Sequence, residues 1–253
     1  MAMKSSSSKM PEVSTEIQST ERRARPLPEE GPLSIVFEDE WLIVLDKPPG
    51  IVVHPTYKNW SGTLLNSVLW RVRDRVGAQP GILTRLDKDT SGLVVMALTP
   101  EVHAAMQRDQ NAGRVHKDYL AVVQGTPEPA FGSISLPLGR DLADRRRVIV
   151  TDTGAASETR YEVMARLHGD TSLVRCELVT GRTHQIRVHL AARGWPIVGD
   201  ATYGVTSATI TRQALHAWRV RFPHPSTRQP IDLAAPVPSD MRSAIGDAQN
   251  VTL

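Results

Sequence analysis

Leu83-Thr84-Arg85-Leu86-Asp87-Lys88-Asp89-Thr90-Ser91-Gly92 leads directly into Leu93-Val94-Val95-Met96-Ala97-Leu98, so a polar turn precedes an apolar strand. A charged turn at the end of a rigid element is where folds commonly place functional side chains. Arg85 stands two residues before Asp87, and a nearby cation favours the charged form of a carboxylate. Asp87 is therefore the first candidate for a nucleophile or a base.

The segments around this turn predict many strands and few helices. Apolar and alternating patterns predict strands at 35–37, 41–45, 93–98, 115–123, 146–151, 157–166, 172–179, 215–222 and 231–233. Helical spacing and capping residues predict helices at 64–72, 101–111 and 183–190, and a last helix capped by Pro238-Ser239-Asp240. Several neighbouring strands lack a helix between them. We therefore expect an α+β fold, with a long mixed, mostly antiparallel sheet flanked by helices and loops, rather than a doubly wound sheet.

The 253 residues divide into a tail and one domain. Residues 1–30 hold a serine run and several prolines with almost no apolar periodicity, so we expect a disordered N-terminal tail. Residues 31–253 then form a single catalytic domain. The net charge of +3 is a mild basic bias, compatible with a nucleic-acid partner but weak as evidence.

The cysteine count and the lack of long apolar segments in the sequence bear on where in the cell the protein is expected. Cys176 lies in an alternating strand pattern, which favours a buried thiol over a nucleophile, and one cysteine allows no intrachain disulfide. No apolar run reaches the roughly 18 residues of a membrane span, and the N-terminus lacks the apolar core of a signal peptide. We expect a cytoplasmic protein with no membrane association.

Two further segments are rich in chemically useful side chains. Lys117-Asp118-Tyr119 lies on a predicted strand, and Thr180-Gly181-Arg182-Thr183-His184-Gln185-Ile186-Arg187-Val188-His189 opens a predicted helix. The N-terminus of a helix offers free N–H groups and positive potential, which attract carboxylate or phosphate. Arg182 at this point can pair with a carboxylate through two hydrogen bonds.

Taken together, these segments resemble the RluA-type pseudouridine synthases, which isomerise uridines in ribosomal large-subunit and transfer RNA. The resemblance spans about residues 33–240 and follows the family's order. The matching segments are Asp46-Lys47-Pro48-Pro49-Gly50-Ile51-Val52-Val53-His54-Pro55, Arg85 to Leu93, Lys117-Asp118-Tyr119, Thr180 to His189, Pro196-Ile197-Val198-Gly199-Asp200 with Tyr203-Gly204, and Leu215-His216-Ala217. Thr84 departs from the pattern, because the family usually has histidine there.

The resemblance implies a set of roles and a substrate. Asp87 would be the central catalyst, Tyr119 an active-site tyrosine, and Arg182 the basic partner of Asp87. Arg85 would fill the gap left by the flipped target base. The further expected RNA contacts are Thr84, His184, Gln185 and Arg187. The expected protein is a monomer that acts on structured ribosomal or transfer RNA and needs neither cofactor nor metal.

Other interpretations stay open beside this one. Asp87 and Asp89 form the D-x-D pattern of haloacid-dehalogenase-type phosphatases, although there the nucleophile follows an apolar strand rather than preceding one. A catalytically inactive RNA-binding module is the third possibility. His184 and His189 have a spacing that suits neither one helix face nor one strand face, which argues against a metal pair. Basic stretches can line an RNA path or form a solvated face; they are Arg71/Arg73/Arg75, Arg140, Arg145-Arg146-Arg147 and Arg212/Arg219/Arg221.

Overall fold

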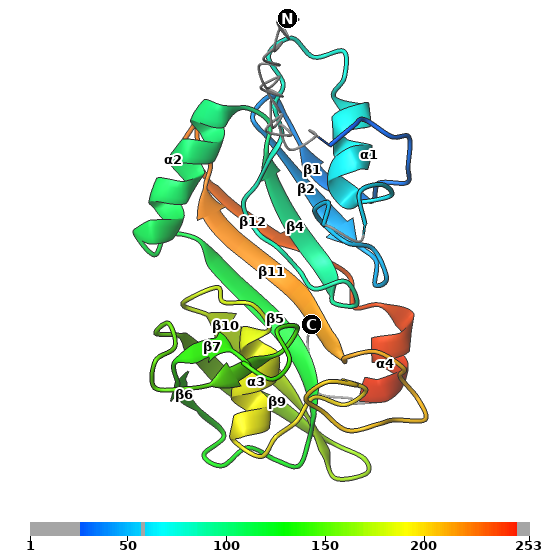
Figure 1. Ribbon diagram of the computed structural model, residues 1–253, viewed down its shortest axis with the longest axis vertical. Coiled ribbons are helices and arrows are strands. Elements are labelled where there is room, and N and C mark those ends of the chain that lie inside the picture. Colours follow the sequence, from blue (N-terminus) through cyan, green and yellow to red (C-terminus); the bar gives the residue numbers. More distant parts are fainter. Residues whose placement is uncertain (1–25, 57–58, 247–253) are drawn as a thin grey trace, which may run out of the picture.

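The computed structural model describes residues 26–56 and 59–246. Its described part holds one large mixed sheet with helices packed against it (Figure 1). The strands of the large sheet are β1 (Ile35–Glu38), β2 (Leu42–Lys47), β3 (Gly81–Ile82), β4 (Ser91–Ala97), β5 (His116–Gln124), β6 (Phe131–Ser135), β9 (Glu158–Leu167), β10 (Thr171–Leu178), β11 (Leu215–Pro223) and β12 (Pro230–Ala234). A separate hairpin consists of β7 (Leu138–Arg140) and β8 (Val148–Val150). The helices are α1 (Leu64–Arg71), α2 (Pro100–Asn111), α3 (Gln185–Ala192) and α4 (Ser239–Ile245).

The strand order is β1-β2-β4-β11-β5-β10-β9-β6, with β3 added to β4 and β12 added to β11. Among the described strands every pairing is antiparallel except that of β4 with β11. The predicted fold class, a mixed and mostly antiparallel sheet in an α+β domain, is confirmed.

The β4–β11 pairing joins the two halves of the sheet at its middle. Gly92 pairs with Ala217 there, and its φ of +107° lies in a region that favours glycine. A Cβ atom at Gly92 would stand 2.2 Å from the carbonyl oxygen of Ala217. Only glycine lets the two backbones approach this closely, which gives a physical reason for the glycine at the end of the 83–92 stretch.

Strand β4 is buried on both faces, as its unbroken apolar sequence predicts. Val94 and Met96 pack with α1, whereas Leu93 and Val95 pack with α2 and with β11 and β12. A third core cluster joins β5, β9 and β10 to α3 and α4. Leu86 touches both this cluster and the α1 cluster, so the 83–90 turn lies where the two halves of the core meet.

The helix ends agree with the capping signals in the sequence. Thr63 and Asn66 form a capping box at the start of α1, and Thr99 caps α2 with Pro100 in its first turn. Helix α3, predicted from Thr183, begins instead at Gln185, because His184 adopts a left-handed conformation with φ of 55°.

Most of the predicted tail lies outside the described residues, and the prediction of disorder for residues 1–25 is untested. Residues 26–30 are described and lie against the start of α1. The carbonyl oxygen of Leu27 accepts a hydrogen bond from Asn66 Nδ2 at 2.7 Å, and Glu29 Oε2 accepts one from Gly62 N at 2.7 Å. Residues 26–30 therefore contact the domain, although the prediction places them in the tail.

Other local predictions concern single side chains. Cys176 is fully buried, and burial raises the pKa of its thiol to about 12, so it is an unreactive core residue. His189 is buried among Ser157, Thr159 and Leu136 and hydrogen-bonds to all three, a structural role.

Within the described ranges, no helix combines the length and the apolar character needed to cross a bilayer.

His216 on β11 gives the fold a specific acid sensitivity. It is fully buried beside Ser91, and burial lowers its pKa from 6.5 to about 4. Between these two values the unfolded chain binds a proton that the folded chain does not, so stability is lost as the pH falls from about 6.5 to about 4. The shift corresponds to about 3 kcal/mol for this one group. Urea unfolding of the wild type and of His216→Gln across pH 4–8 measures how much stability each protein loses toward low pH.

The variant should lose less stability over this window than the wild type does. Parallel curves for wild type and His216→Gln would contradict the assignment.

Candidate active site

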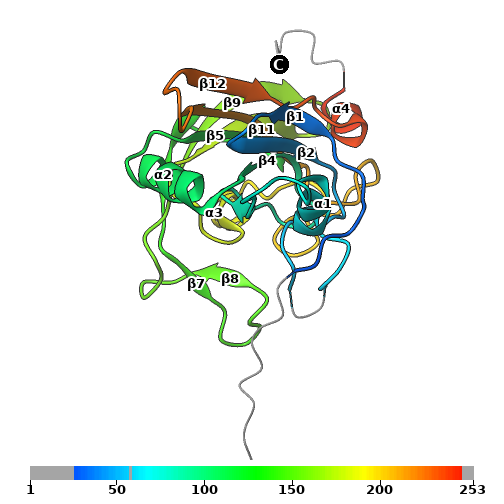
Figure 2. The same cartoon turned by 90° about the horizontal axis from the view of Figure 1, so that it is seen from above.

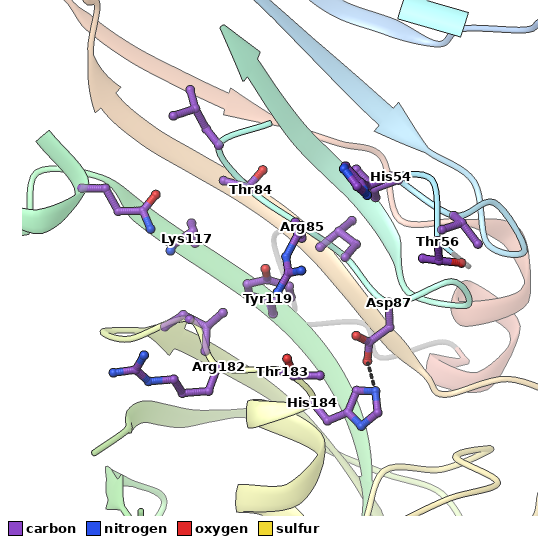
Figure 3. A pocket seen from close by; sticks show the side chains of 17 residues that line it. His54, Thr56, Thr84, Arg85, Asp87, Lys117, Tyr119, Arg182, Thr183 and His184 are labelled. Carbon is purple, nitrogen blue, oxygen red and sulfur yellow. Dashed lines mark ion pairs between the residues drawn. The ribbon is translucent and has the colours of Figure 1, made fainter. Parts of the chain in front are cut away.

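A cleft of about 420 Å³ opens over the middle of the sheet, between the 83–90 turn and the loop that precedes α3 (Figure 3). Its volume falls in the range of pockets that hold small ligands. The lining side chains come from segments far apart in the sequence. They include His54, Arg85, Asp87, Lys117, Tyr119, Arg182, Thr183 and His184.

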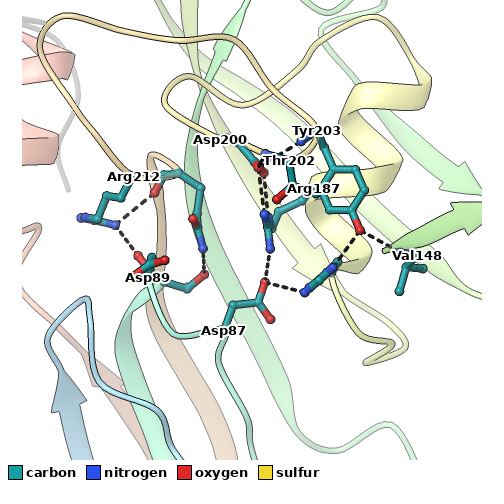
Figure 4. Close-up of polar contacts among 11 residues, drawn as sticks. Asp87, Asp89, Val148, Arg187, Asp200, Thr202, Tyr203 and Arg212 are labelled. Carbon is teal, nitrogen blue, oxygen red and sulfur yellow. Dashed lines mark hydrogen bonds and ion pairs between the residues drawn. The ribbon is translucent and has the colours of Figure 1, made fainter. Parts of the chain in front are cut away.

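The backbone of the 83–90 turn is held by two cations beneath it. Lys47 is fully buried, and its Nζ donates to the carbonyl oxygen of Lys88 at 2.9 Å. Burial lowers the pKa of Lys47 to about 8, although the charges of Asp89 and Asp87 act in the opposite direction. Arg212 donates to the carbonyl oxygen of Asp89 at 3.1 Å (Figure 4). These contacts fix the turn, and with it the position of Asp87.

The two carboxylate oxygens of Asp87 have different surroundings. Oδ2 accepts a hydrogen bond from Arg187 Nη1 at 2.8 Å and lies 3.8 Å from Nε2 of His184. Oδ1 has no hydrogen-bond partner among residues 26–56 and 59–246. The side chain is 27% exposed and lines the cleft (Figure 3). One oxygen is thus held by the protein while the other is free to meet a ligand.

Arg187 is itself fixed by a buried carboxylate (Figure 4). Its Nε and Nη2 donate to the two oxygens of Asp200 at 2.6 and 2.8 Å. Burial works to raise the pKa of Asp200, but the hydrogen bonds and charge of Arg187 outweigh it and hold that pKa below its usual value. The backbone N–H groups of Thr202 and Tyr203 also donate to Asp200 Oδ1. Asp200, Arg187 and Asp87 therefore form one connected chain of charges.

The prediction that Arg182 is the basic partner of Asp87 is wrong, because Arg187 forms the ion pair with Asp87. Arg182 is exposed at the rim of the cleft and donates to the carbonyl oxygen of Ala156 at 3.3 Å. The left-handed turn at His184 delays the helix start, so Arg187 falls in the first turn of α3. Long side chains on a helix point back toward its N-terminus, which brings the Arg187 guanidinium to the cleft.

Three of the predicted RNA contacts hold the protein together instead. Arg187 is buried in the ion pairs just described. Gln185 is buried as well, and its amide oxygen accepts from Thr180 and from the Arg182 N–H while its amide nitrogen donates to Glu158 and Thr159. Thr84 borders the cleft, but its hydroxyl accepts a hydrogen bond from Val95 N at 2.9 Å. This last contact ties the turn to β4.

Tyr119 and Arg85 lie where the sequence predicts, in the wall of the cleft (Figure 3). Tyr119 is buried, and burial together with the negative charge of Asp87 raises the pKa of its phenol above its usual value. The phenol is therefore protonated at neutral pH. Arg85 is exposed and has no hydrogen-bonding or ion-pair partner among the described residues. His184 also borders the cleft, beside Asp87.

Many of the arginines proposed for an RNA path are committed to ion pairs. Arg71 and Arg75 contact Glu38, Arg73 contacts Asp74, and Arg146 contacts Asp144. Arg212, Arg219 and Arg221 contact Asp240, Asp232 and Asp118. Within the described ranges, Arg140, Arg145 and Arg147 have no carboxylate partner, and all three belong to the β7–β8 hairpin or its connecting loop.

Comparison with known proteins agrees with this geometry. The family model described as RNA pseudouridylate synthase matches residues 41–192. The chain belongs to this family. Ribosomal large subunit pseudouridine synthase D of Nitrosomonas europaea is 42% identical over 87% of this chain and 66% of its own length. The protein of the same name from Xanthomonas campestris is 41% identical over 88% of this chain and 71% of its own length.

The fold is shared with solved members of the family. The structure of human RNA pseudouridylate synthase domain containing 1 superposes with a TM-score of 0.66 at 29% identity, covering 82% of this chain and 86% of that one. The phosphatase and the inactive RNA-binding module are not supported, since family and fold both match RNA-modifying isomerases. In addition, Asp87 precedes rather than follows its apolar strand.

Two residues of the site were missed from the sequence. Asp200 and Tyr203 lie in the loop after α3 and belong to the matching Gly199-Asp200 and Tyr203-Gly204 segments, but no role was assigned to them. Their place in two of the matching segments is the one signal in the sequence that could have marked them as site residues. The sequence gives no indication of which arginine pairs with Asp200.

Proposed function

We propose that this protein converts uridine to pseudouridine in ribosomal RNA of the large subunit, with Asp87 as the catalytic residue. The observation that carries the proposal is the position of the Asp87 carboxylate. Its Oδ2 is held by Arg187, whereas its Oδ1 is open to the cleft. The choice of large-subunit RNA rests on the two relatives whose names state that substrate.

The reaction suits a single carboxylate. The N1–C1′ glycosidic bond breaks, the uracil turns, C5 bonds to C1′, and the hydrogen on C5 leaves. Hydrolysis of a glycosidic bond uses two carboxylates because water must be activated or the sugar held, whereas an isomerase keeps its leaving base. Oδ1 of Asp87 can attack C1′ or remove the C2′ proton, and both steps need a charged carboxylate, which Arg187 holds in place at Oδ2.

The neighbouring side chains supply the remaining functions. Tyr119 is protonated beside the charged Asp87, which suits stacking or hydrogen-bond donation to the uracil better than removal of the C5 proton. Flipping a base out of folded RNA costs a few kcal/mol. Arg85 can offset part of this cost, because its planar guanidinium can stack where the base was. Its exposure and its lack of a described partner support that role.

We propose further that the protein works as a monomer in the cytoplasm, where ribosomal RNA is found. The unpaired arginines of the β7–β8 hairpin and Arg182 at the cleft rim are available for RNA phosphates.

Pseudouridine mapping in cells that lack this protein tests the proposed substrate. We expect at least one uridine of large-subunit ribosomal RNA to stay unmodified, with transfer RNA unchanged. The purified protein should then modify the same position in ribosomal RNA from these cells. Loss of pseudouridine from transfer RNA alone would contradict the substrate, and no release of tritium from [5-³H]uridine-labelled RNA of either kind would contradict the activity.

A further inference from the structure

We propose that His184 and Tyr203 are positioning residues for Asp87, joined by hydrogen bonds to the arginine-rich β7–β8 hairpin. The inference rests on the proposed function of Asp87. It goes beyond that function because it assigns a role to two side chains that need not touch the uridine.

A backbone N–H group restricts the hydrogen bonds of the Tyr203 hydroxyl, and we infer their directions from it. The hydroxyl of Tyr203 accepts a hydrogen bond from the N–H of Val148 at 2.8 Å (Figure 4). The same hydroxyl lies 2.8 Å from Nδ1 of His184. Since a backbone N–H can only donate, the proton of the Tyr203 hydroxyl is free to go to His184 Nδ1. Nδ1 is then an acceptor, and the neutral imidazole carries its hydrogen on Nε2.

This tautomer directs a donor at Asp87. Nε2 of His184 lies 3.8 Å from Asp87 Oδ2, the same oxygen that Arg187 holds at 2.8 Å. A short movement of the ring closes this distance to a hydrogen bond, as catalytic contacts commonly tighten once a substrate is bound. Two donors on Oδ2 would leave Oδ1 as the oxygen that reacts.

Tyr203 is well fixed for this task. Its backbone N–H donates to Asp200, its ring lies over the Arg187 guanidinium at 5.0 Å, and it meets the His184 ring edge-on at 5.5 Å. On the other side Arg147 approaches the same ring at 5.7 Å. One aromatic ring therefore contacts the ion pair that holds Asp87, the histidine beside Asp87, and the hairpin.

The hairpin is joined to the body by a small apolar contact. Leu138 and Val148 pack against Val188 of α3 and against Tyr203. Figure 2 shows the hairpin projecting from the body, away from the sheet. Its loop carries three of the chain's exposed arginines, Arg145, Arg146 and Arg147. RNA that orders this loop would also fix Val148 and, through Tyr203, the orientation of His184.

Burial of the His184 ring favours its neutral form. Burial lowers its pKa, and Arg187 acts in the same direction, whereas Asp87 and Asp200 act in the opposite one. The other titratable side chains that line the cleft or touch Tyr203 are His54, Arg85, Lys117, Tyr119, Arg147 and Arg182. With the Tyr203 hydroxyl removed, Nδ1 is open to a proton, and a charged imidazole would compete with the substrate for Asp87.

Tyr203→Phe tests the inference because it removes one oxygen and keeps the ring over Arg187. We expect kcat for tritium release from [5-³H]uridine-labelled ribosomal RNA to fall roughly 10- to 100-fold, with RNA affinity within about twofold of wild type. We also expect a new loss of activity toward low pH that the wild type lacks. Tyr161→Phe, which removes another buried hydroxyl far from the cleft, should change neither quantity.

A double mutant separates positioning from a general loss of structure. If both residues act on Asp87 in series, His184→Gln combined with Tyr203→Phe should be about as slow as the slower single variant. Multiplied effects, or a pH profile of Tyr203→Phe equal to that of the wild type, would overturn the inference. In either case the wild type still releases tritium, whereas failure of the proposed function would leave the wild type inactive too.

Discussion

Asp87→Asn loses essentially all pseudouridine formation, and we expect kcat to fall by at least about 1,000-fold. Asparagine keeps the shape of the side chain and can still accept a hydrogen bond from Arg187. It lacks the negative charge needed to attack C1′ or to take the C2′ proton. Because Arg187 remains paired with Asp200, folding and RNA binding should change little. Tritium release from [5-³H]uridine-labelled RNA measures turnover. Thermal unfolding measures stability, and filter binding measures RNA affinity.

Asp89→Asn is the matched control two residues along the same turn. The backbone of Asp89 is fixed by Arg212, and its side chain neither hydrogen-bonds to Asp87 nor lines the cleft, although its charge raises the pKa of Lys47. It should retain most of the wild-type turnover. Near-normal turnover in Asp87→Asn would refute the mechanism. An equal loss of turnover in both variants would instead favour a chemistry that needs both carboxylates of the D-x-D pattern, Asp87 and Asp89.

Arg187→Met should damage both activity and stability. The change removes the cation that holds Asp87 and leaves Asp200 charged and fully buried without its partner. Removing one member of a buried ion pair typically destabilises a protein by about 3–5 kcal/mol. We expect a fall in melting temperature together with a loss of kcat of more than about 100-fold. Calorimetry and tritium release under identical buffer conditions check the two effects.

A second substitution separates the two effects of Arg187. Combining Arg187→Met with Asp200→Asn removes both charges, so stability should recover in part while activity stays low. Arg182→Gln, the exposed arginine first expected in this role, should weaken RNA binding but leave kcat within a fewfold of wild type. If Arg182→Gln lost kcat as severely as Arg187→Met, the assignment of the Asp87 partner would be wrong.

The fold was predictable where local patterns and core burial agree. Strand β4 is apolar on both faces and has a glycine at its start, and the structure buries both faces and uses the glycine for a close backbone contact. The two-residue strand β3 was not predicted, and neither were strands β6 and β7. Their segment holds serine, glycine and proline residues, and Ile134 is the one buried residue of β6, so their pairing depends on neighbours distant in the sequence.

The candidate site was predictable in its residue types but not in its pairings. Asp87, Tyr119 and Arg85 meet in the cleft as the motifs suggest. The choice between Arg182 and Arg187 depended on one backbone angle, at His184, which composition and spacing do not reveal. Sequence motifs place charged groups near one another, but the direction of each side chain is decided by where a helix begins.

The close contact between Gly92 and Ala217 has a mechanical consequence. It joins the two halves of the sheet directly beneath the cleft, where many two-lobed enzymes have a hinge instead. We therefore expect the two halves of the sheet to move together rather than to close about this line. Most of the movement then falls to the RNA, and we expect uridines in loosely stacked, easily opened segments to reach Asp87 fastest.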